Sequence, residues 1–231
     1  MLRFFQADRF SNSLRAKSSH APREIRHQDA LDSDLRINYL LSVRVAFKEW
    51  AIIVDALGRG EQIILLRKGG ISERRGGFKP EHSEFLLFPT LFHQQRDSVV
   101  PAAQVRYDLI EPGLPAKDRL RLEFFCQVVA CRQLDSPATT EPLRGQHIWR
   151  DEVISSRFEW GKEKSIYALA VRVFRLPHAV ELPMRESYGG CNSWIELETD
   201  ASTNDAKPVL STAEFEGKLK EIHRALELTT R

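Results

Sequence analysis

The chain has few cysteines, no long apolar run and almost no net charge, and each of these absences excludes a class of protein. Three cysteines among 231 residues cannot all pair, whereas a small secreted domain held by disulfides carries more of them at regular spacing. No apolar run approaches the about 20 residues of a transmembrane helix, and the first residues lack the apolar core and cleavage site of a signal peptide. We therefore expect a cytoplasmic protein that does not act at a membrane.

The charge balance also limits the surface. A formal net charge of +2 is too small to mark the whole molecule as a nucleic-acid binder, so any basic surface must be a local patch. Cys126 and Cys131 have the spacing C-x4-C and lack the second Cys or His pair of a structural zinc site. We expect neither a structural metal nor a cofactor.

The segments of the chain differ in composition. Residues 1–44 carry Ser, Arg and Asp with little periodicity, so we expect a disordered N-terminal extension there. The main domain is expected over residues 45–200, and a linker with a C-terminal helix over residues 201–231. The start of that helix, Ser211-Thr212-Ala213-Glu214, has the capping-box pattern.

Periodicity predicts the elements of the main domain. Helical spacing predicts helices over residues 47–57, 147–159 and 211–226. Apolar runs and alternation predict strands over residues 62–66, 85–88, 119–134, 167–173 and 193–198, with another short strand at 104–109. We expect the strand that begins at Tyr167 to stop at Leu176-Pro177. The regular strand–helix alternation of a doubly wound parallel sheet is absent, so the predicted fold class is α+β, with a mixed, mostly antiparallel sheet and flanking helices.

Two glycine pairs and several cations share the loop over residues 67–82. Glycine lets backbone N–H groups approach a ligand closely, and cations attract an oxyanion. The predicted phosphate or nucleic-acid contacts are Arg67, Lys68, Gly69, Gly70, Gly76, Gly77 and Lys79. The other interpretation is a hairpin with solvated cations. The Walker spacing is missing, so nucleotide hydrolysis is not indicated.

Two further groups of residues could carry chemistry. The titratable candidates Glu81, His82, Glu84 and His93 flank a predicted strand and could hold a divalent metal or act as acid and base if they converge. In a second loop, Tyr188, Asn192, Ser193 and Trp194 offer stacking faces and hydrogen bonds that suit a base or a sugar, although a turn with two aromatic anchors explains them nearly as well. Glu49 could pair with Arg67 or Lys68 if its element packs beneath that strand end.

Several stretches resemble the bacterial domain of unknown function 1802 family between about residues 45 and 198. They include Ala46-Phe47-Lys48-Glu49-Trp50, Leu65-Leu66-Arg67-Lys68-Gly69-Gly70-Ile71, Gly76-Gly77-Phe78, Phe85-Leu86-Leu87-Phe88-Pro89-Thr90 and Tyr188-Gly189-Gly190-Cys191. The family has no assigned activity, and its association with restriction-endonuclease-like domains implies a part in DNA restriction or defence, with partner proteins of such a system. Residues 47–67 are also similar to the start of ASCH and PUA-like RNA-binding barrels, which implies a barrel whose strand end lines a nucleotide cleft.

Three functions are consistent with these residues. The preferred one is recognition of a nucleic acid or nucleotide through phosphate, without catalysis. The second is an enzyme acting on a phosphate-containing substrate, such as a nuclease-like component that uses the titratable candidates. The third is a protein-interaction scaffold. No D-x(n)-E-x-K nuclease pattern is clear, so catalysis ranks below binding.

Overall fold

The computed structural model describes residues 42–68, 81–161 and 164–228. Within these residues one sheet contains the strands β1 (Ser42–Trp50), β2 (Ile64–Arg67), β3 (Glu84–Thr90), β4 (Arg119–Leu134), β5 (Ile166–Pro183), β6 (Trp194–Ser202) and β7 (Lys207–Pro208). The α-helices are α1 (Ala51–Gly58), α2 (Pro101–Ile110), α3 (Asp151–Glu159) and α4 (Thr212–Leu228), and 3-10 turns lie at His93–Ser98, Glu111–Gly113, Pro137–Leu143 and Glu186–Tyr188.

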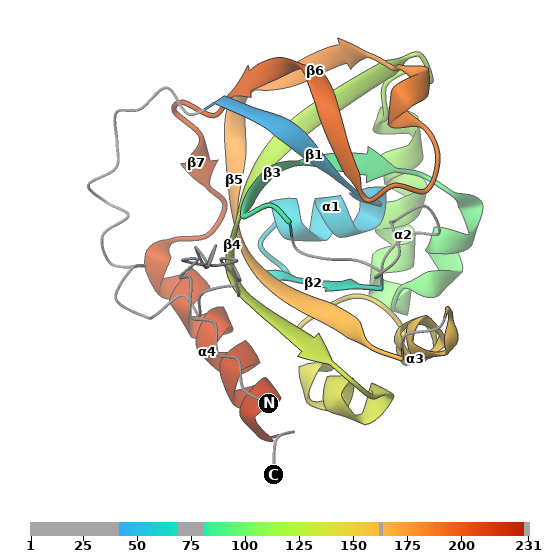
Figure 1. Cartoon of the computed structure of the whole chain (residues 1–231), viewed down its shortest axis with the longest axis vertical. Helices are drawn as coiled ribbons and strands as arrows, with labels where there is room; N and C mark the ends of the chain where they lie inside the picture. The colour runs from blue at the N-terminus through green and yellow to red at the C-terminus, as the bar shows by residue number, and fades with distance from the viewer. Residues whose placement is uncertain (1–41, 69–80, 162–163, 229–231) are drawn as a thin grey trace, which may run out of the picture.

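The sheet is mixed and mostly antiparallel, which confirms the predicted α+β class. Its strand order is β2-β5-β4-β3-β1-β6, with β7 added on β5, and β1 and β3 are its parallel pair. The strands curve around α1, which lies inside the curve (Figure 1). The predicted barrel is wrong, because β2 and β6 end the sheet on its two sides and do not pair with each other in the described residues.

The segment predicted as one helix over residues 47–57 is two elements. Residues 47–50 finish β1, and only the remainder forms α1. Four consecutive residues of β1, 46–49, are buried, because the strand lies between β3 and β6 and packs on both faces. A strand buried on both faces loses the apolar–polar alternation that identifies strands in a sequence, so the apolar spacing matched a helix by coincidence.

Residues 104–109, predicted as a short strand, belong to α2 instead. Pro101 begins this helix, where its missing N–H would have had no partner in any case. Ala103 and Tyr107, four residues apart, are the buried positions of its ten residues. With only these two residues turned to the core, the helical period in the sequence is faint.

The strand predicted to stop at Leu176-Pro177 continues to Pro183. Arg175 pairs with Phe124 and Val180 pairs with Leu122, so the residues of β5 between them have no ladder partner in β4. Pro177 lies in this bulge, where its lack of an N–H removes no ladder hydrogen bond.

The other predicted elements are found close to their expected positions. Strand β4 has the bounds predicted for it, and β2, β3 and β6 differ from the prediction by a few residues. Helix α3 begins at Asp151, later than predicted, because Trp149 forms an isolated bridge with Val99. The predicted disordered extension lies outside the described residues up to position 41, and Ser42 to Arg44 belong to β1.

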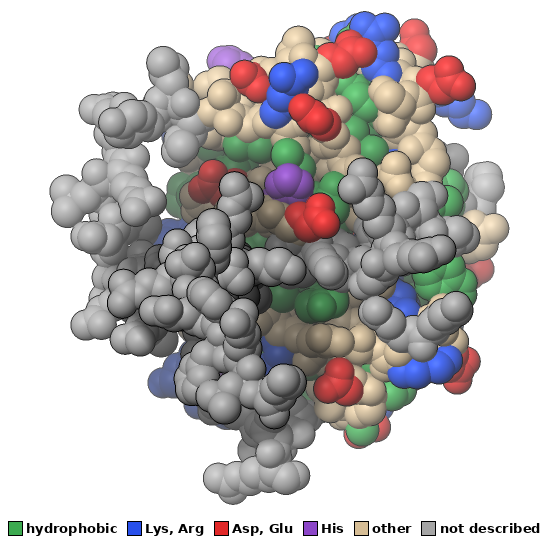
Figure 2. Space-filling model, in the orientation of Figure 1, with side chains coloured by type: hydrophobic (Ala, Val, Ile, Leu, Met, Phe, Trp, Pro, Cys, Tyr) green, Lys and Arg blue, Asp and Glu red, His purple; other side chains and the backbone are tan. Residues whose placement is uncertain are grey.

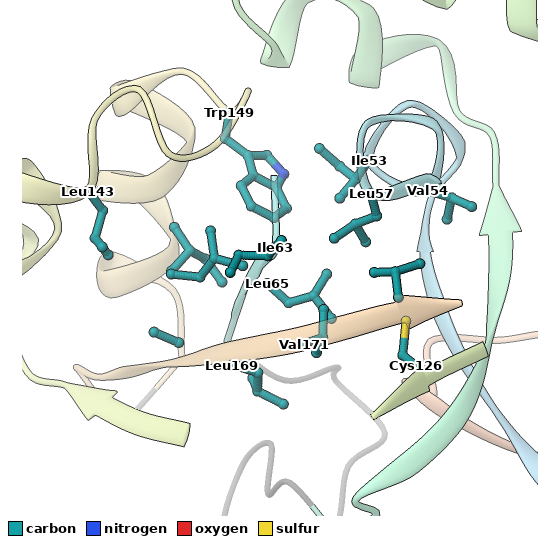
Figure 3. Packing of buried hydrophobic residues seen from close by; sticks show 14 of the residues in the cluster. Ile53, Val54, Leu57, Ile63, Leu65, Cys126, Leu143, Trp149, Leu169 and Val171 are labelled. Carbon is teal, nitrogen blue, oxygen red and sulfur yellow. The ribbon is translucent and has the colours of Figure 1, made fainter. Parts of the chain in front are cut away.

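The main core lies between α1 and the sheet that surrounds it. Ile53 and Leu57 of α1 pack with Leu65 and Val171 of the sheet, and Trp149 closes one side (Figure 3). Burying each such aliphatic side chain stabilises the fold by about 1.5–3 kcal/mol. No helix among the described residues is both long and apolar enough to cross a bilayer.

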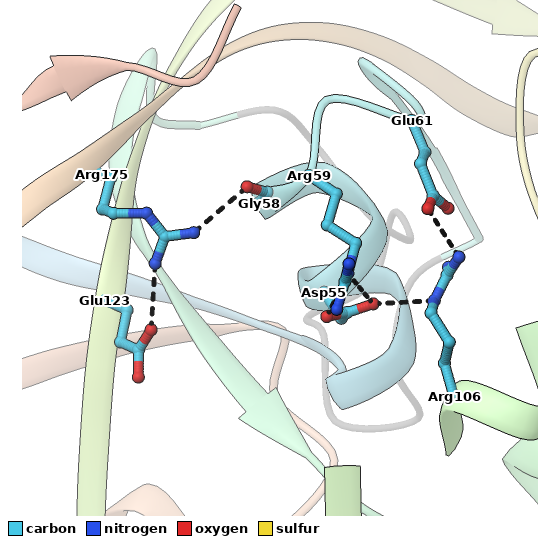
Figure 4. A network of polar contacts seen from close by, with 7 residues as sticks. All are labelled: Asp55, Gly58, Arg59, Glu61, Arg106, Glu123 and Arg175. Carbon is cyan, nitrogen blue, oxygen red and sulfur yellow. Dashed lines mark hydrogen bonds and ion pairs between the residues drawn. The ribbon is translucent and has the colours of Figure 1, made fainter. Parts of the chain in front are cut away.

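Polar contacts fix the outer side of α1 (Figure 4). Arg106 of α2 pairs with Asp55 of α1 at 3.0 Å. Arg175 of β5 donates to the carbonyl of Gly58 at 3.3 Å and pairs with Glu123 at 3.4 Å. The Arg175–Glu123 pair is exposed and contributes about 0–1 kcal/mol, whereas the Arg106–Asp55 pair is partly buried, and together these contacts orient α1.

The predicted capping box of α4 is present and gives a stability prediction. The backbone N–H of Glu214 donates to the Ser211 hydroxyl at 3.3 Å, and the backbone N–H of Ser211 donates to the Glu214 carboxylate at 2.9 Å. Ser211→Ala should lower the free energy of unfolding by about 1 kcal/mol, because one N–H at the helix start loses its acceptor. Ser211→Asp, which keeps an acceptor, is the control. Urea unfolding that gives the same stability for all three proteins would show that the cap contributes nothing.

Candidate functional site

Three strand ends meet beside α1, on the right in Figure 1. Strand β1 ends at Trp50, β2 ends at Arg67, and β6 begins just after Ser193. The Arg67 guanidinium donates from Nε and Nη2 to the Ser193 hydroxyl, at 3.3 and 2.9 Å. Since β2 and β6 are opposite edges of the sheet, this contact joins the two edges through side chains.

Glu49 supplies the negative charge at this junction. Its side chain is fully buried, and its Oε2 lies 3.8 Å from Nη1 of Arg67. The other carboxylate oxygen accepts the backbone N–H of Trp50 at 2.8 Å, whereas Oε2 accepts no hydrogen bond from the described residues. Glu49 therefore pairs with Arg67 as the sequence suggested, from a strand instead of a helix.

Arg157 brings a second guanidinium to the junction from α3. It lies over two indole rings, with its Cζ 5.3 Å from the ring centre of Trp50 and 4.9 Å from that of Trp149. It also donates to the carbonyl of Leu66, the residue before Arg67. The pKa of Arg157 is lowered to about 10, mainly by burial. The negative charge of Glu49 partly opposes this shift, and the positive charge of Arg67 adds to it.

Lys48 lies on the face of β1 opposite Glu49 and holds the loop that leads to β6. Its Nζ donates to the carbonyls of Gly189 and Gly190, at 2.9 and 3.1 Å. Burial lowers the pKa of Lys48, the Cys191 thiolate would raise it, and the charge of Arg67 lowers it. The lysine is thus a buried cation that backbone carbonyls solvate.

The junction carries more positive than negative charge. Arg67 and Arg157 lie near one buried carboxylate, that of Glu49, while Lys48 lies on the other face of β1 and Lys68 follows Arg67 in the chain. Burial is the main cause that lowers the pKa values of Lys48 and Arg157, and the charge of Arg67 lowers both further, so the other three cations are close enough to Arg67 to form one positively charged group with a single carboxylate. We call these five residues the basic junction.

The predicted phosphate loop begins at the basic junction. Arg67 and Lys68 belong to it, and the Lys68 Nζ donates to the carbonyl of Ser165 at 3.1 Å. The other predicted phosphate contacts lie outside the described residues: Gly69, Gly70, Gly76, Gly77 and Lys79.

The four residues predicted to contact a base or sugar have different surroundings. Tyr188 is 3% exposed, and its hydroxyl accepts a backbone N–H of β6 at 3.0 Å. Ser193 is buried against Arg67, and the Trp194 ring centre lies 4.7 Å from that of Phe47 in the core. Asn192 is exposed. Tyr188 and Ser193 thus hold the loop in place, and base contact by the four residues stays a prediction.

The titratable candidates do not form one group in the described part of the chain. His82 packs against Trp194, with ring centres 4.9 Å apart, Glu81 is exposed, and Glu84 accepts a hydrogen bond from Gln127 at 3.0 Å. The backbone of His93 lies past the other end of β3, about 20 Å away along a strand of this length. Within the ranges 42–68, 81–161 and 164–228, no three His, Cys, Asp or Glu residues are placed to hold a metal.

The model of a family described as "Domain of unknown function (DUF1802)" matches residues 46–221. The chain belongs to the DUF1802 family. This confirms the resemblance drawn from the sequence motifs and extends it through most of α4. No curated protein matches the chain.

Solved structures of the ASCH protein from Zymomonas mobilis are similar to this DUF1802 domain, in line with the likeness predicted for residues 47–67. The unsubstituted protein shares 11% identity with a TM-score of 0.36, covering 77% of this chain and 94% of its own. A serine-to-alanine variant gives 14% identity and 0.36, with coverage of 79% and 99%, and a tyrosine-to-phenylalanine variant gives 14% and 0.38, with coverage of 77% and 96%. At these TM-scores the likeness carries no argument about how this chain acts.

Sequence reasoning missed two cations of the DUF1802 basic junction. Lys48 lies in the stretch predicted as a helix, where a lysine next to a glutamate indicates two solvated charges and no buried site. Arg157 lies in an amphipathic helix, and only the tertiary fold turns it toward Trp50. A signal was available in Arg157 alone: it stands three residues after Ile154 and one before Phe158, both buried, and so near the apolar face of its helix.

A separate hollow of the described structure lies elsewhere. It is a cavity of about 320 Å³ between α4 and the face of β4 and β5 that α4 covers. The small side chains of Ala130, Ala168 and Ala170 leave room for it, and Ile222 and His223 of α4 line its other side. Its lining is mainly apolar and shares no residue with the basic junction. Cys131, a free cysteine, belongs to its lining, and burial raises the pKa of the Cys131 thiol.

Glu49→Gln should destabilise the fold by about 3 kcal/mol, because it leaves the partly buried guanidinium groups of Arg67 and Arg157 without their counter-charge. Glu196→Gln is the matched control, since Glu196 forms an exposed ion pair with Arg44 and its loss should cost less than about 1 kcal/mol. Chemical denaturation of the three proteins measures the difference. Equal stabilities for wild type and Glu49→Gln would mean that Glu49 does not balance the charge of the junction.

His147 should make stability depend on pH. Burial lowers the pKa of this histidine to about 4, and the positive charge of Arg157 adds to the effect. In the unfolded chain the pKa is about 6.5, so the unfolded state binds the proton more readily. The contribution is complete above pH 6.5 and should decline by up to about 3 kcal/mol as the pH falls to 4.

Unfolding free energies measured between pH 7 and pH 4 test this dependence. His147→Gln should flatten the decline over that range, whereas His178→Gln, which changes an exposed histidine of β5, should leave it as in wild type. A decline that is the same in wild type and His147→Gln would assign the pH dependence to other groups.

Proposed function

We propose that this domain recognises a nucleic acid or nucleotide through its phosphates, and that the basic junction is where the phosphate binds. The observation that carries the proposal is the surplus of positive charge in a partly buried place. Protein interiors pair their buried charges, because an unpaired buried ion costs several kcal/mol. An anion bound at the junction would supply the charge that Glu49 alone does not.

The positions of the cations support an anion that arrives from solvent. The Arg67 side chain is 20% exposed, although its inner side contacts Ser193 and Glu49. Lys68, the next residue, is also partly exposed. The ligand would therefore meet these two side chains first, with the charge of Arg157 behind them.

The coloured part of the face in Figure 2 carries no large basic patch that would compete with the junction. On the face shown in Figure 2, basic and acidic side chains are interspersed over the part drawn in colour. The near balance of charge over the whole chain agrees with this pattern. A phosphate ligand would thus be attracted by the local field of the junction and not by the protein as a whole.

No observation favours catalysis or a scaffold role over binding. The candidate acids and bases of β3 do not gather in the described residues, and the DUF1802 family carries no activity in its description. A part in DNA restriction or defence, which the family resemblance implied, stays a prediction.

Lys68→Ala should weaken binding in a salt-dependent way. If Lys68 contacts a phosphate, its loss should reduce the slope of log K against log salt by about 0.7 for a single strand and about 0.9 for duplex DNA. Fluorescence anisotropy with labelled DNA and RNA at 50 to 200 mM salt measures the slope. Lys207→Ala, an exposed lysine of β7, is the control and should keep the wild-type slope. Wild-type protein that binds neither DNA, RNA nor nucleotides would refute the proposed function.

A further inference from the structure

The last residues of α3 and the residue just before β5 both contact the basic junction. At the start of the connection between them, Arg157 donates to the carbonyl of Leu66, and at its end the Lys68 Nζ donates to the carbonyl of Ser165. Tyr167, at the start of β5, pairs directly with Arg67. Both ends of this connection are thus fixed to the last residues of β2, and Figure 1 shows α3 beside that strand.

Trp160 projects from this connection. It follows the last residue of α3, and its backbone N–H still donates to the carbonyl of Ser156 at 3.2 Å. Gly161 then takes a positive φ of 75°, which turns the chain away from the helix. Five peptide steps lead from Trp160 to Ser165, so their Cα atoms are at most about 17 Å apart.

Trp160 is the most exposed tryptophan of the chain. It is 47% exposed, whereas Trp149 is 1% exposed and Trp50 and Trp194 are partly buried in the core. Among the described residues its ring stacks on no other ring and lies under no cation. The other large exposed apolar side chains of the described residues belong to other segments of the chain: Phe92, Val105, Leu109 and Met184.

We infer that the ligand is a single-stranded nucleic acid, and that Trp160 stacks on one of its bases while Lys68 and Arg67 hold a neighbouring phosphate. This inference rests on the proposed function and narrows its ligand. An aromatic face beside cations is the combination that proteins use for single strands, because every unpaired base offers a π-face. In a duplex the bases already stack on one another, so an exposed indole has no base to cover. The Cα of Trp160 lies at most about 17 Å from that of Ser165, whose carbonyl holds Lys68, and a span of this order suits a few nucleotides of an extended strand.

The test uses the full chain and four variants: Trp160→Ala, Trp160→Phe, Lys68→Ala and Leu109→Ala. Each is titrated into a fluorescein-labelled 12-nucleotide DNA, the same sequence as RNA, and the blunt DNA duplex. Thermal melts establish that every variant is folded. Leu109→Ala removes an exposed apolar side chain of α2 and controls for a general surface effect.

Wild type should bind the single strands more tightly than the duplex. Trp160→Ala should weaken single-strand binding about 10-fold, because one base loses its stacking partner. Trp160→Phe should retain most of the affinity, and Leu109→Ala all of it. Binding should also quench the tryptophan emission of wild type, and this quenching should be lost largely in Trp160→Phe.

Two results would overturn the inference while the proposed function stands. The first is a wild type that binds the duplex more tightly than the single strands. The second is a folded Trp160→Ala that binds single strands as tightly as wild type, while Lys68→Ala binds them less tightly. A wild type that binds none of the three nucleic acids would overturn both the inference and a nucleic-acid function.

Discussion

The contact between Arg67 and Ser193 joins the two edge strands of the open sheet. Packing around α1 holds the sheet in its curve, and this contact links the end of β2 to the start of β6. Backbone pairing cannot do this, because the strands are not neighbours, so a long side chain from one edge reaches a hydroxyl at the other. Arg67 then needs a buried counter-charge, which Glu49 provides from β1, the strand next to the edge strand β6. Arg157 attaches α3 to β2 through the Leu66 carbonyl, so the buried charge, the two sheet edges and α3 meet at one place.

Two consecutive residues of β1 organise both sides of this bridge. Lys48 and Glu49 point to opposite faces of the strand, as neighbours in a strand must. Glu49 faces Arg67, whereas Lys48 holds the carbonyls of Gly189 and Gly190 and so fixes the loop that presents Ser193. The hydroxyl and the guanidinium are therefore both held before any ligand arrives. Such preorganisation reduces the entropy that a ligand would have to remove on binding.

The sequence predicted those parts of the fold whose pattern is local. Strand β4 begins with alternating apolar and charged residues and continues as an apolar run, and the Ser211 cap marks the start of α4, so both could be placed closely. Strand β1 could not, because burial on both faces erased its alternation. The site could likewise be predicted only where its pattern is local. The sequence showed the cations of the loop, Arg67 among them. The contact between Arg67 and Ser193 could not be predicted, because it joins residues 126 positions apart. Arg157 reaches the junction only through the packing of α3, which no local pattern encodes.

The structural role of Arg67 does not exclude a ligand. A guanidinium has five N–H donors, and the described contacts of Arg67 use one on Nε and one on Nη2 for Ser193. The distance of 3.8 Å from Nη1 to Glu49 is longer than the about 2.7–2.9 Å of a charge-assisted hydrogen bond, so this pair is an electrostatic contact that leaves the Nη1 hydrogens without an acceptor among the described residues. A phosphate oxygen can therefore accept from Arg67 while the edge-to-edge contact remains. Binding at the junction would add a negative charge beside Arg157 and Lys48 without opening the sheet.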